Sequence, residues 1–313
     1  MQTILGSGGA IGIELAKALK NFTSDIRLVS RNPLKVNETD KTFQADLTDR
    51  NAIFSAVKGS EIVYLTIGLE YKTKVWQTAW PLLMKNVIDA CTENNSKLVF
   101  FDNVYMIGGD QVKHITENSP VSPTSKKGEI RAALDKLILN HIEQGKLTAI
   151  IARSADFYGA VKERSLIMEM VYKNLEQNKK ANWLCNAKVK HSFTYTPDAG
   201  KATALLGNTP DACNQVWNLP TDHNNLTGEE WINAFAREMG KSNKYMVLPK
   251  MMIGILGLFV PIMKEFYEMT YQYDREYIFD SSKFEKRFGM KPTPYMEGLR
   301  ETLRVIRKTK DVG

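Results

Sequence analysis

A cluster of glycines lies within the first twelve residues, between a short apolar run and the start of an amphipathic helical pattern. The stretch reads Met1-Gln2-Thr3-Ile4-Leu5-Gly6-Ser7-Gly8-Gly9-Ala10-Ile11-Gly12. Glycines at a strand end permit a tight turn, and residues without a Cβ atom let the backbone approach an anion closely. The following helix N-terminus offers N–H groups and the positive end of its dipole. The spacing therefore predicts a diphosphate site, although ordinary turns also contain glycines.

Polar residues follow the next predicted strand, which covers residues 26–30. Ser30 and Arg31 stand where an acidic residue would bind an adenosine ribose and repel a 2′-phosphate. Arg31 instead offers a planar fork of donors that suits this phosphate. We therefore predict NADP as the cofactor rather than NAD, with an exposed loop cation as the alternative role of Arg31.

Two further strand ends complete the predicted cofactor site. Asp46 can accept a hydrogen bond from the adenine amino group while Leu47 packs on the ring, and helix capping by Thr48 or Asp49 is compatible with this role. The backbone at the end of the next strand would line the middle of the cofactor. The predicted contacts are Gly6, Ser7, Gly8, Gly9, Ala10, Ile11, Gly12, Ser30, Arg31, Asp46, Leu47, Thr66, Ile67 and Gly68.

Short apolar runs alternate with helical patterns through the first half of the chain. After the first strand, we expect strands at 26–30, 42–47, 61–67, 97–101 and 147–151, and helices near 10–20, 49–58, 73–95 and 125–144. This order predicts an α/β fold with a Rossmann-type, doubly wound parallel sheet that binds ligands at the carboxyl ends of its strands.

The second half is expected to form a smaller lobe. Helical patterns lie near 163–179, 197–206, 227–240, 250–272 and 295–308, and extended pieces at 191–196 and 215–219 could rejoin the main sheet. We therefore predict an NADP-binding domain over residues 1–155. A small, mostly helical substrate lobe is predicted over residues 156–313, with segments that rejoin the main domain.

The composition limits the class of protein. The 313 residues are 43% apolar and carry a net charge of +7, which suits an anionic ligand. The basic residues are spread along the chain, which argues against nucleic acid as a partner. Cys91, Cys185 and Cys213 lie far apart and no leader pattern is visible, so a cytoplasmic location is expected. No His, Cys, Asp and Glu residues share the spacing of metal ligands, so no metal is predicted.

The apolar segment 251–263 is shorter than the roughly 20 residues that a membrane-spanning helix needs. Lys250 and Lys264 bound it, and two glycines interrupt it. We expect no membrane span. A buried or interface helix is the first interpretation, and a lid over the substrate or a surface that touches a membrane is the alternative.

Several short motifs follow one another in a characteristic order. They are Gly6, Gly9 and Gly12, then Asp46-Leu47, 87–91, Val104-Tyr105, 153–159, 191–199 and 217–220. This order resembles the extended short-chain dehydrogenase/reductase superfamily, in its NAD-dependent epimerase/dehydratase branch, to about residue 240. The resemblance implies that a hydride moves between nicotinamide and a carbinol or carbonyl of a small molecule. It also implies a homodimer that pairs helices 73–95 and 125–144.

The chain departs from this pattern at the catalytic residues. The family carries Tyr-x-x-x-Lys on the helix after the fifth strand, and alignment on Pro123 and Gly128 puts Lys127 and Arg131 at these positions. Arg131 can bond the nicotinamide ribose but cannot exchange a proton near neutral pH. Lys127 can act as the acid/base if desolvation and the Arg131 charge lower its pKa; otherwise it binds an anion or faces solvent. Tyr105 is the second candidate acid.

The remaining candidates follow the fifth and sixth strands. Asp102 and Asn103 take the place of the family's serine or threonine. Asp102 is predicted to contact substrate or to orient Lys127, with capping of a turn as the alternative, and Asn103 is predicted to contact the cofactor. The predicted substrate contacts are Asp102, Asp156, Tyr158, His191 and Tyr195, with a structural role as the alternative for His191. Together they predict an NADP(H)-dependent oxidoreductase or epimerase-like enzyme. A catalytically silent protein that binds NADP(H) as a redox sensor or regulator is the alternative.

Overall fold

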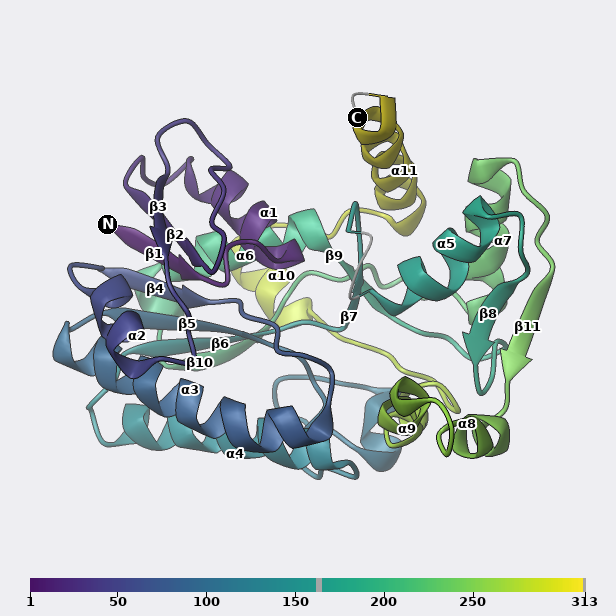
Figure 1. Cartoon of the computed structure of the whole chain (residues 1–313), viewed down its shortest axis with the longest axis horizontal. Coiled ribbons are helices and arrows are strands. Elements are labelled where there is room, and N and C mark those ends of the chain that lie inside the picture. The colour runs from purple at the N-terminus through teal and green to yellow at the C-terminus, as the bar shows by residue number, and fades with distance from the viewer. Residues whose placement is uncertain (162–164, 312–313) are drawn as a thin grey trace. The chain divides into compact units, whose positions relative to one another are not determined.

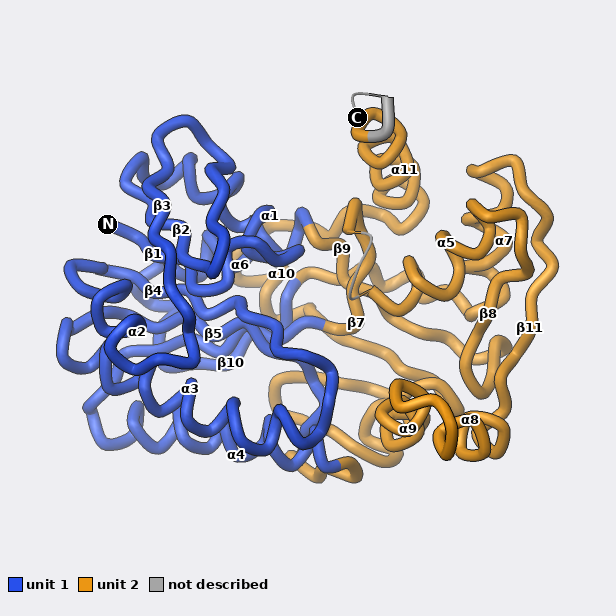
Figure 2. The backbone as a smooth tube through the Cα atoms, viewed as in Figure 1, with its two compact units in different colours: residues 1–106, 126–154, 197–219 blue, residues 107–125, 155–196, 220–313 orange. Residues whose placement is uncertain are grey.

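The structure is a computed structural model that describes residues 1–161 and 165–311. The chain forms two compact units (Figure 2). Unit 1 comprises Met1–Met106, Lys126–Ser154 and Pro197–Leu219, and unit 2 comprises Ile107–Ser125, Ala155–Thr196 and Pro220–Gly313. Residues 197–219 thus belong to unit 1 although they follow the expected boundary at residue 155, and residues 107–125 belong to unit 2 although they precede it.

Unit 1 contains a seven-stranded sheet in which every pairing is parallel (Figure 1). Its strand order is β10-β6-β5-β4-β1-β2-β3. The strands are β1 (Gln2–Leu5), β2 (Ile26–Ser30), β3 (Lys41–Gln44), β4 (Ile62–Leu65), β5 (Lys97–Asp102), β6 (Ala149–Arg153) and β10 (Gln215–Asn218). All residues of β1, β4 and β6 are buried, as expected for central strands covered on both faces. The predicted fold class is confirmed.

Helices cover both faces of this sheet (Figure 1). They are α1 (Ala10–Leu19), α2 (Arg50–Val57), α3 (Thr73–Glu93), α4 (Lys126–Glu143) and α6 (Thr196–Gly207). Asp49 caps α2 by accepting hydrogen bonds from the backbone N–H groups of Asn51 and Ala52. Strand order reverses beside β1, which places the glycine loop at the switch point where ligands bind in such sheets.

Unit 2 is built around two small parallel sheets and an aromatic core. β7 (Asp156–Tyr158) pairs with β9 (Phe193–Tyr195), and β8 (Ala181–Leu184) pairs with β11 (Tyr245–Leu248). The core includes Tyr158, Trp183 and Trp231. Its helices are α5 (Lys173–Glu176), α7 (Gly228–Met239), α8 (Lys250–Leu256), α9 (Pro261–Tyr267), α10 (Ser282–Phe288) and α11 (Tyr295–Asp311). A π-helical turn at Met168–Tyr172 precedes α5, and short 3₁₀ turns lie at Gly109–Lys113, Pro210–Ala212 and Thr270–Gln272.

Several element boundaries differ from the sequence-based expectation. The helix expected over 250–272 is divided into α8, α9 and a 3₁₀ turn, because Pro261 starts a new helix after the turn at Gly257–Val260. The helix expected over 163–179 is shorter, and residues 163 and 164 lie outside the described part. β3 ends at Gln44 rather than Leu47, because Asp46 turns the chain by accepting a hydrogen bond from Thr48 N.

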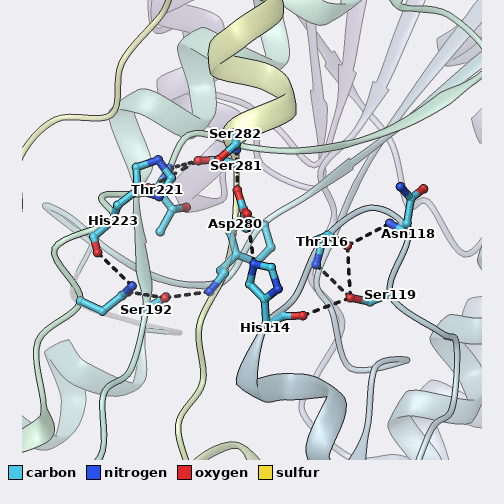
Figure 3. Close-up of polar contacts among 12 residues, drawn as sticks. His114, Thr116, Asn118, Ser119, Ser192, Thr221, His223, Asp280, Ser281 and Ser282 are labelled. Carbon is cyan, nitrogen blue, oxygen red and sulfur yellow. Dashed lines mark hydrogen bonds and ion pairs between the residues drawn. The ribbon is translucent and has the colours of Figure 1, made fainter.

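A strap in unit 2, residues 277–282, is held by hydrogen bonds from other segments (Figure 3). His114 Nε2 lies 3.1 Å from Asp280 Oδ2. Ser192 Oγ accepts a hydrogen bond from the backbone N–H of Phe279, and Ser281 Oγ accepts one from the backbone N–H of Thr221. These hydrogen bonds join segments of unit 2 that are far apart in the sequence, so the strap helps to hold unit 2 together.

Candidate functional site

The glycine loop between β1 and α1 is shaped by two glycines that no other residue can replace without strain. Gly6 has φ +99°, and a Cβ atom there would lie 2.7 Å from Ile67 Cα. A Cβ atom at Gly12 would lie 2.6 Å from the carbonyl oxygen of Gly6. Both values are far inside van der Waals contact, so these two glycines let the loop pack against the start of α1 and the end of β4.

The opposite side of the loop is open and fits an anion. A Cβ atom at Gly8 would meet no atom within 4 Å. Gly9 is the N-cap of α1, so no side chain caps the helix, and no acidic residue lies in its first turn, which holds Ala10, Ile11 and Gly12. The buried Ser7 Oγ has no hydrogen-bond partner within the described residues. The helix dipole, open N–H groups and unpaired hydroxyl fit a phosphate group.

Alanine substitutions at Gly12 and Gly8 are expected to separate folding from binding. Gly12→Ala should lower the free energy of unfolding by about 1–3 kcal/mol, because its Cβ overpacks the loop. Gly8→Ala should stay within about 0.5 kcal/mol of wild type but weaken a dinucleotide whose phosphate approaches Gly8. Urea unfolding and ligand titration measure the two effects. Equal stability of the two variants would contradict this assignment.

The ends of β2 and β3 bring further predicted residues to the same sheet edge, because Ser30 pairs in register with Gln44. Ser30 Oγ has no hydrogen-bond partner among the residues described. Arg31 is exposed. Asp46 Oδ1 accepts hydrogen bonds from Thr48 N and Oγ1, and these bonds, with the positive charge of Arg31, lower the pKa of Asp46. Asp46 is therefore an anion in the ordinary pH range.

Two other predicted cofactor contacts have clear packing roles. Leu47 is buried in the main core of unit 1. Thr66 donates its backbone N–H to Leu5 O at 2.9 Å, and the backbone of Ile67 faces Gly6, so the segment that leads into Gly68 lies beside the glycine loop. The structure thus brings the predicted residues of β1, β2, β3 and β4 to one edge, while their contacts with a cofactor stay predictions.

Four buried charged side chains form a tetrad at the ends of β5 and β6: Asp102, Arg131, Asp135 and Arg153. Arg131 Nη1 lies 2.9 Å from Asp102 Oδ1, and Arg153 Nη2 lies 2.6 Å from Asp135 Oδ2. Burial raises the pKa of Asp102, and the Arg131 charge opposes this rise. Two acids and two arginines together limit the uncompensated buried charge.

The Arg131 guanidinium also lies against aromatic rings. Its Cζ atom is 4.1 Å from the ring centroid of Trp80 and 4.8 Å from that of Trp76. Arg131 Nε is buried and has no hydrogen-bond partner within the described residues. The side chain is therefore anchored by one carboxylate and by aromatic rings while its Nε donor is unused, and the predicted contact of Arg131 with a ribose stays a prediction.

Lys127 lies one turn before Arg131 on α4 and is fully buried. Its Nζ donates a hydrogen bond to Thr73 Oγ1 at 2.9 Å and lies 4.7 Å from the ring centroid of Tyr71. The possibility that Lys127 simply faces solvent is therefore wrong. A buried ammonium with a hydroxyl partner can hold or transfer a proton, so the acid/base role stays a prediction.

The chain after β5 is fixed by hydrogen bonds between neighbouring residues. Asn103 N donates to Asp102 Oδ1 at 2.8 Å, and Tyr105 N donates to Asn103 Oδ1 at 3.0 Å. The Tyr105 ring stacks on Trp76 with a centroid distance of 6.1 Å. The cofactor role of Asn103 and the acid role of Tyr105 stay predictions.

In unit 2, His191 is held by a carboxylate and two tyrosines. Its Nε2 lies 3.0 Å from Asp156 Oδ2, and the Tyr273 hydroxyl donates a hydrogen bond to the same oxygen. The imidazole stacks between Tyr273 and Tyr277, with both centroid distances 4.4 Å. His191 is 1% exposed, whereas the Asp156 side chain is 18% exposed. This geometry makes His191 an internal partner of Asp156, and Asp156 is the member of the cluster that solvent reaches.

Sequence reasoning missed Tyr273, because no pattern connects it with residues more than eighty positions earlier. Tyr158 and Tyr195 were predicted as substrate contacts, and their rings stack at 5.1 Å within the core of unit 2. A Cβ atom at Gly298 would clash with the Tyr158 hydroxyl, so close packing surrounds this ring. The substrate roles of Asp156, Tyr158, His191 and Tyr195 stay predictions.

Two features are absent from the described residues. No group of three or more His, Cys, Asp and Glu side chains is placed to hold a metal ion in residues 1–161 and 165–311. Among the helices of the same ranges, none is both long and apolar enough to cross a membrane.

The model of the NAD dependent epimerase/dehydratase family matches residues 3–219 of the chain. The chain belongs to this family. The resemblance deduced from the motifs is therefore confirmed, and the match includes the glycine loop, the tetrad and α4. No curated protein sequence matches the chain at a significant level.

Solved structures with the same fold cover nearly the whole length of this family member. MoeE5 in complex with UDP-glucose and NAD has a TM-score of 0.79 at 17% identity, and 99% of each chain is covered. The Thermus thermophilus UDP-glucose 4-epimerase complex with NAD has a TM-score of 0.78 at 16% identity, covering 98% of this chain and 99% of the other. The Bacillus anthracis dTDP-glucose 4,6-dehydratase in complex with NAD has a TM-score of 0.79 at 15% identity, covering 99% of this chain and 97% of the other.

Proposed function

We propose that the protein binds a nicotinamide dinucleotide, NADP(H) in preference to NAD(H), at the glycine loop. We further propose that it acts as an oxidoreductase or epimerase-like enzyme on a carbonyl or carbinol of a small molecule. The observation that carries the proposal is the open face at Gly8 beside the uncapped N-terminus of α1. Family membership supports it, and so do three similar structures that are complexes with NAD.

Each residue has a definite task in this proposal. The first turn of α1 binds the diphosphate, and Arg31 binds the 2′-phosphate. Arg131 donates from Nε to a ribose hydroxyl, while Asp102 and the tryptophan rings hold its guanidinium in place. Lys127 Nζ holds the proton that the substrate oxygen gains or loses, and Thr73 orients it. When bound, the nicotinamide supplies or accepts the hydride.

The function is tested by incubating the protein with NADPH and a panel of aldehydes, ketones and nucleotide sugars. Absorbance follows net oxidation of the reduced nicotinamide, and chromatography of the sugars detects epimerisation, in which no net oxidation occurs. Turnover of one class supports the enzyme and names its substrate class. A cytoplasmic location and a homodimer stay predictions.

A second function, a silent NADP(H)-binding sensor or regulator, is favoured by one observation. Both residues that replace the family's catalytic pair are buried cations, engaged by Thr73 and by Asp102 with its aromatic neighbours. Tight NADPH binding with no turnover across the panel would support this second function and reject the enzyme.

The cofactor preference makes a separate prediction at Arg31. Arg31→Ala should weaken NADPH binding about tenfold to a hundredfold, because a charge-assisted hydrogen bond to the 2′-phosphate is lost. The affinity for NADH should stay nearly unchanged. Isothermal titration of both cofactors measures the difference. Lys58→Ala removes the same charge at the C-cap of α2 and serves as the control. Equal losses of affinity for NADPH and NADH in Arg31→Ala would contradict the assignment of Arg31 to the 2′-phosphate.

A further inference from the structure

Asp156 in unit 2 is a carboxylate that its neighbours hold by one oxygen. The Tyr273 hydroxyl donates a hydrogen bond to Oδ2, and His191 Nε2 lies 3.0 Å from the same oxygen. Every hydrogen bond that the described residues give this carboxylate goes to Oδ2, and 18% of the side chain is exposed. The second oxygen, Oδ1, is therefore held in place and open to a ligand.

The charge of Asp156 is not balanced from within the described part of the chain. No lysine or arginine there lies at ion-pair distance from it, and His191 is its one basic neighbour. Among the same residues, the buried His191 Nδ1 has no hydrogen-bond partner, so a second ring proton would lack an acceptor. The imidazole therefore donates from Nε2 as a neutral ring, and the cluster keeps one negative charge that solvent reaches.

Asp274, in the same unit, is a carboxylate whose charge is balanced. Its side chain is 27% exposed, and Arg275 Nε lies 2.6 Å from its Oδ1. Arg275 Nη1 also lies 2.9 Å from Asp110 Oδ1. One arginine thus serves two acids that are both more exposed than Asp156. A partly buried charge without a counter-charge is costly, which favours a ligand that supplies the cation.

The surroundings of Asp156 are largely apolar. It pairs in register with Phe193 between β7 and β9. Phe193 and Tyr273 line an apolar hollow together with Trp183 and several aliphatic side chains. A cation binds a carboxylate more strongly where water and polar groups are few. A neutral hydroxyl group would supply a donor but leave the charge, whereas an ammonium group supplies a donor and a positive charge together.

We propose that Asp156 Oδ1 binds a protonated amine of the substrate, which makes the substrate an amino ketone, an amino aldehyde or an amino alcohol. This inference rests on the proposed function, because it names the substrate class on which that function acts. It also separates the substrate of this chain from a nucleotide sugar, because a carboxylate without a counter-charge repels a diphosphate.

The test compares ligands that differ by an ammonium group in place of a hydroxyl group. NMR titration of the full chain, with and without NADPH, measures ethanolamine against ethylene glycol and glucosamine against glucose. Wild type should bind each amine about tenfold to a hundredfold more tightly than its hydroxyl counterpart, the usual contribution of a hydrogen bond to a charged group. Asp156→Asn keeps an acceptor for Tyr273 and His191 but should abolish this preference.

Asp274→Asn is the matched control, since it removes the same charge from a carboxylate that Arg275 already balances. This variant should keep the preference for amines. The proposal is overturned if wild type binds the hydroxyl compounds as tightly as the amines, if it binds none of the four, or if the preference survives in Asp156→Asn. The comparison in wild type decides even where Asp156→Asn fails to fold.

Failure of this inference is distinguishable from failure of the proposed function. The titrations need no turnover, so a substrate panel without any reaction would reject the enzyme and leave the amine site standing. Turnover of nucleotide sugars without a preference for amines would support the enzyme and overturn the amine site.

Discussion

Replacing Lys127 by methionine is expected to lower kcat by a factor of about 10²–10⁴, the usual contribution of a positioned acid/base. Methionine keeps most of the buried volume and removes only the ammonium group that now bonds Thr73. The proton that accompanies hydride transfer then has no carrier at this position. Steady-state kinetics with the substrate found in the panel measure the loss, and NADPH titration shows that the cofactor still binds.

Lys126→Met is the matched control, since Lys126 is the preceding residue on α4 and is exposed. This variant should keep kcat within about twofold of wild type, because no buried donor is lost. Unchanged turnover in Lys127→Met would remove Lys127 from the mechanism. A loss shared equally by both variants would assign the effect to net charge on α4 rather than to the buried ammonium.

Replacing Arg131 by methionine is expected to lower the free energy of unfolding by about 3–5 kcal/mol, because Asp102 loses its partner inside the protein. The double variant Asp102→Asn with Arg131→Met removes the orphaned charge and should recover part of this loss. Urea unfolding monitored by tryptophan fluorescence gives both values. Arg304→Met, at an exposed arginine paired with Glu301, should leave the unfolding midpoint unchanged.

The cost of Arg131→Met should also grow with pH. Burial raises the pKa of the folded Asp102 carboxyl, and the Arg131 charge opposes this rise. A carboxyl whose pKa is higher in the folded than in the unfolded protein makes stability fall as the pH rises, until the folded group titrates. Without the Arg131 charge, which lowers this pKa, the fall continues to higher pH. The variant should therefore lose more stability at about pH 9 than at about pH 7. A pH-independent difference would exclude this coupling.

The sequence predicts the framework of the site well, because local patterns control it. Apolar strands such as β4 and β6 are buried on both faces, and this burial requires continuous apolar runs in the sequence. The glycine loop can be predicted for the same reason. Gly6 and Gly12 are required by close contacts with residues nearby in the sequence and with the segment that follows β4. Fold class and family membership follow from these features.

The parts that sequence reasoning missed depend on contacts between distant residues. Tyr273 bonds Asp156 and His114 pairs with Asp280, and neither pair leaves a periodic signal. The tetrad was also missed, although Asp102 and Arg131 were singled out, because its ion pairs join α4 to the ends of β5 and β6. The apolar segment 251–263 was expected as one helix, and only the structure reveals a hairpin with outward side chains.

The central claim is that the glycine loop binds NADP(H), and calorimetric titration of wild type and Gly8→Ala with NADPH and NADH tests it most directly. We predict one NADPH per chain, weaker binding of NADH, and a clear loss of NADPH affinity in Gly8→Ala at unchanged stability. The claim would be contradicted if neither NADPH nor NADH binds, or if wild type and Gly8→Ala bind NADPH with equal affinity.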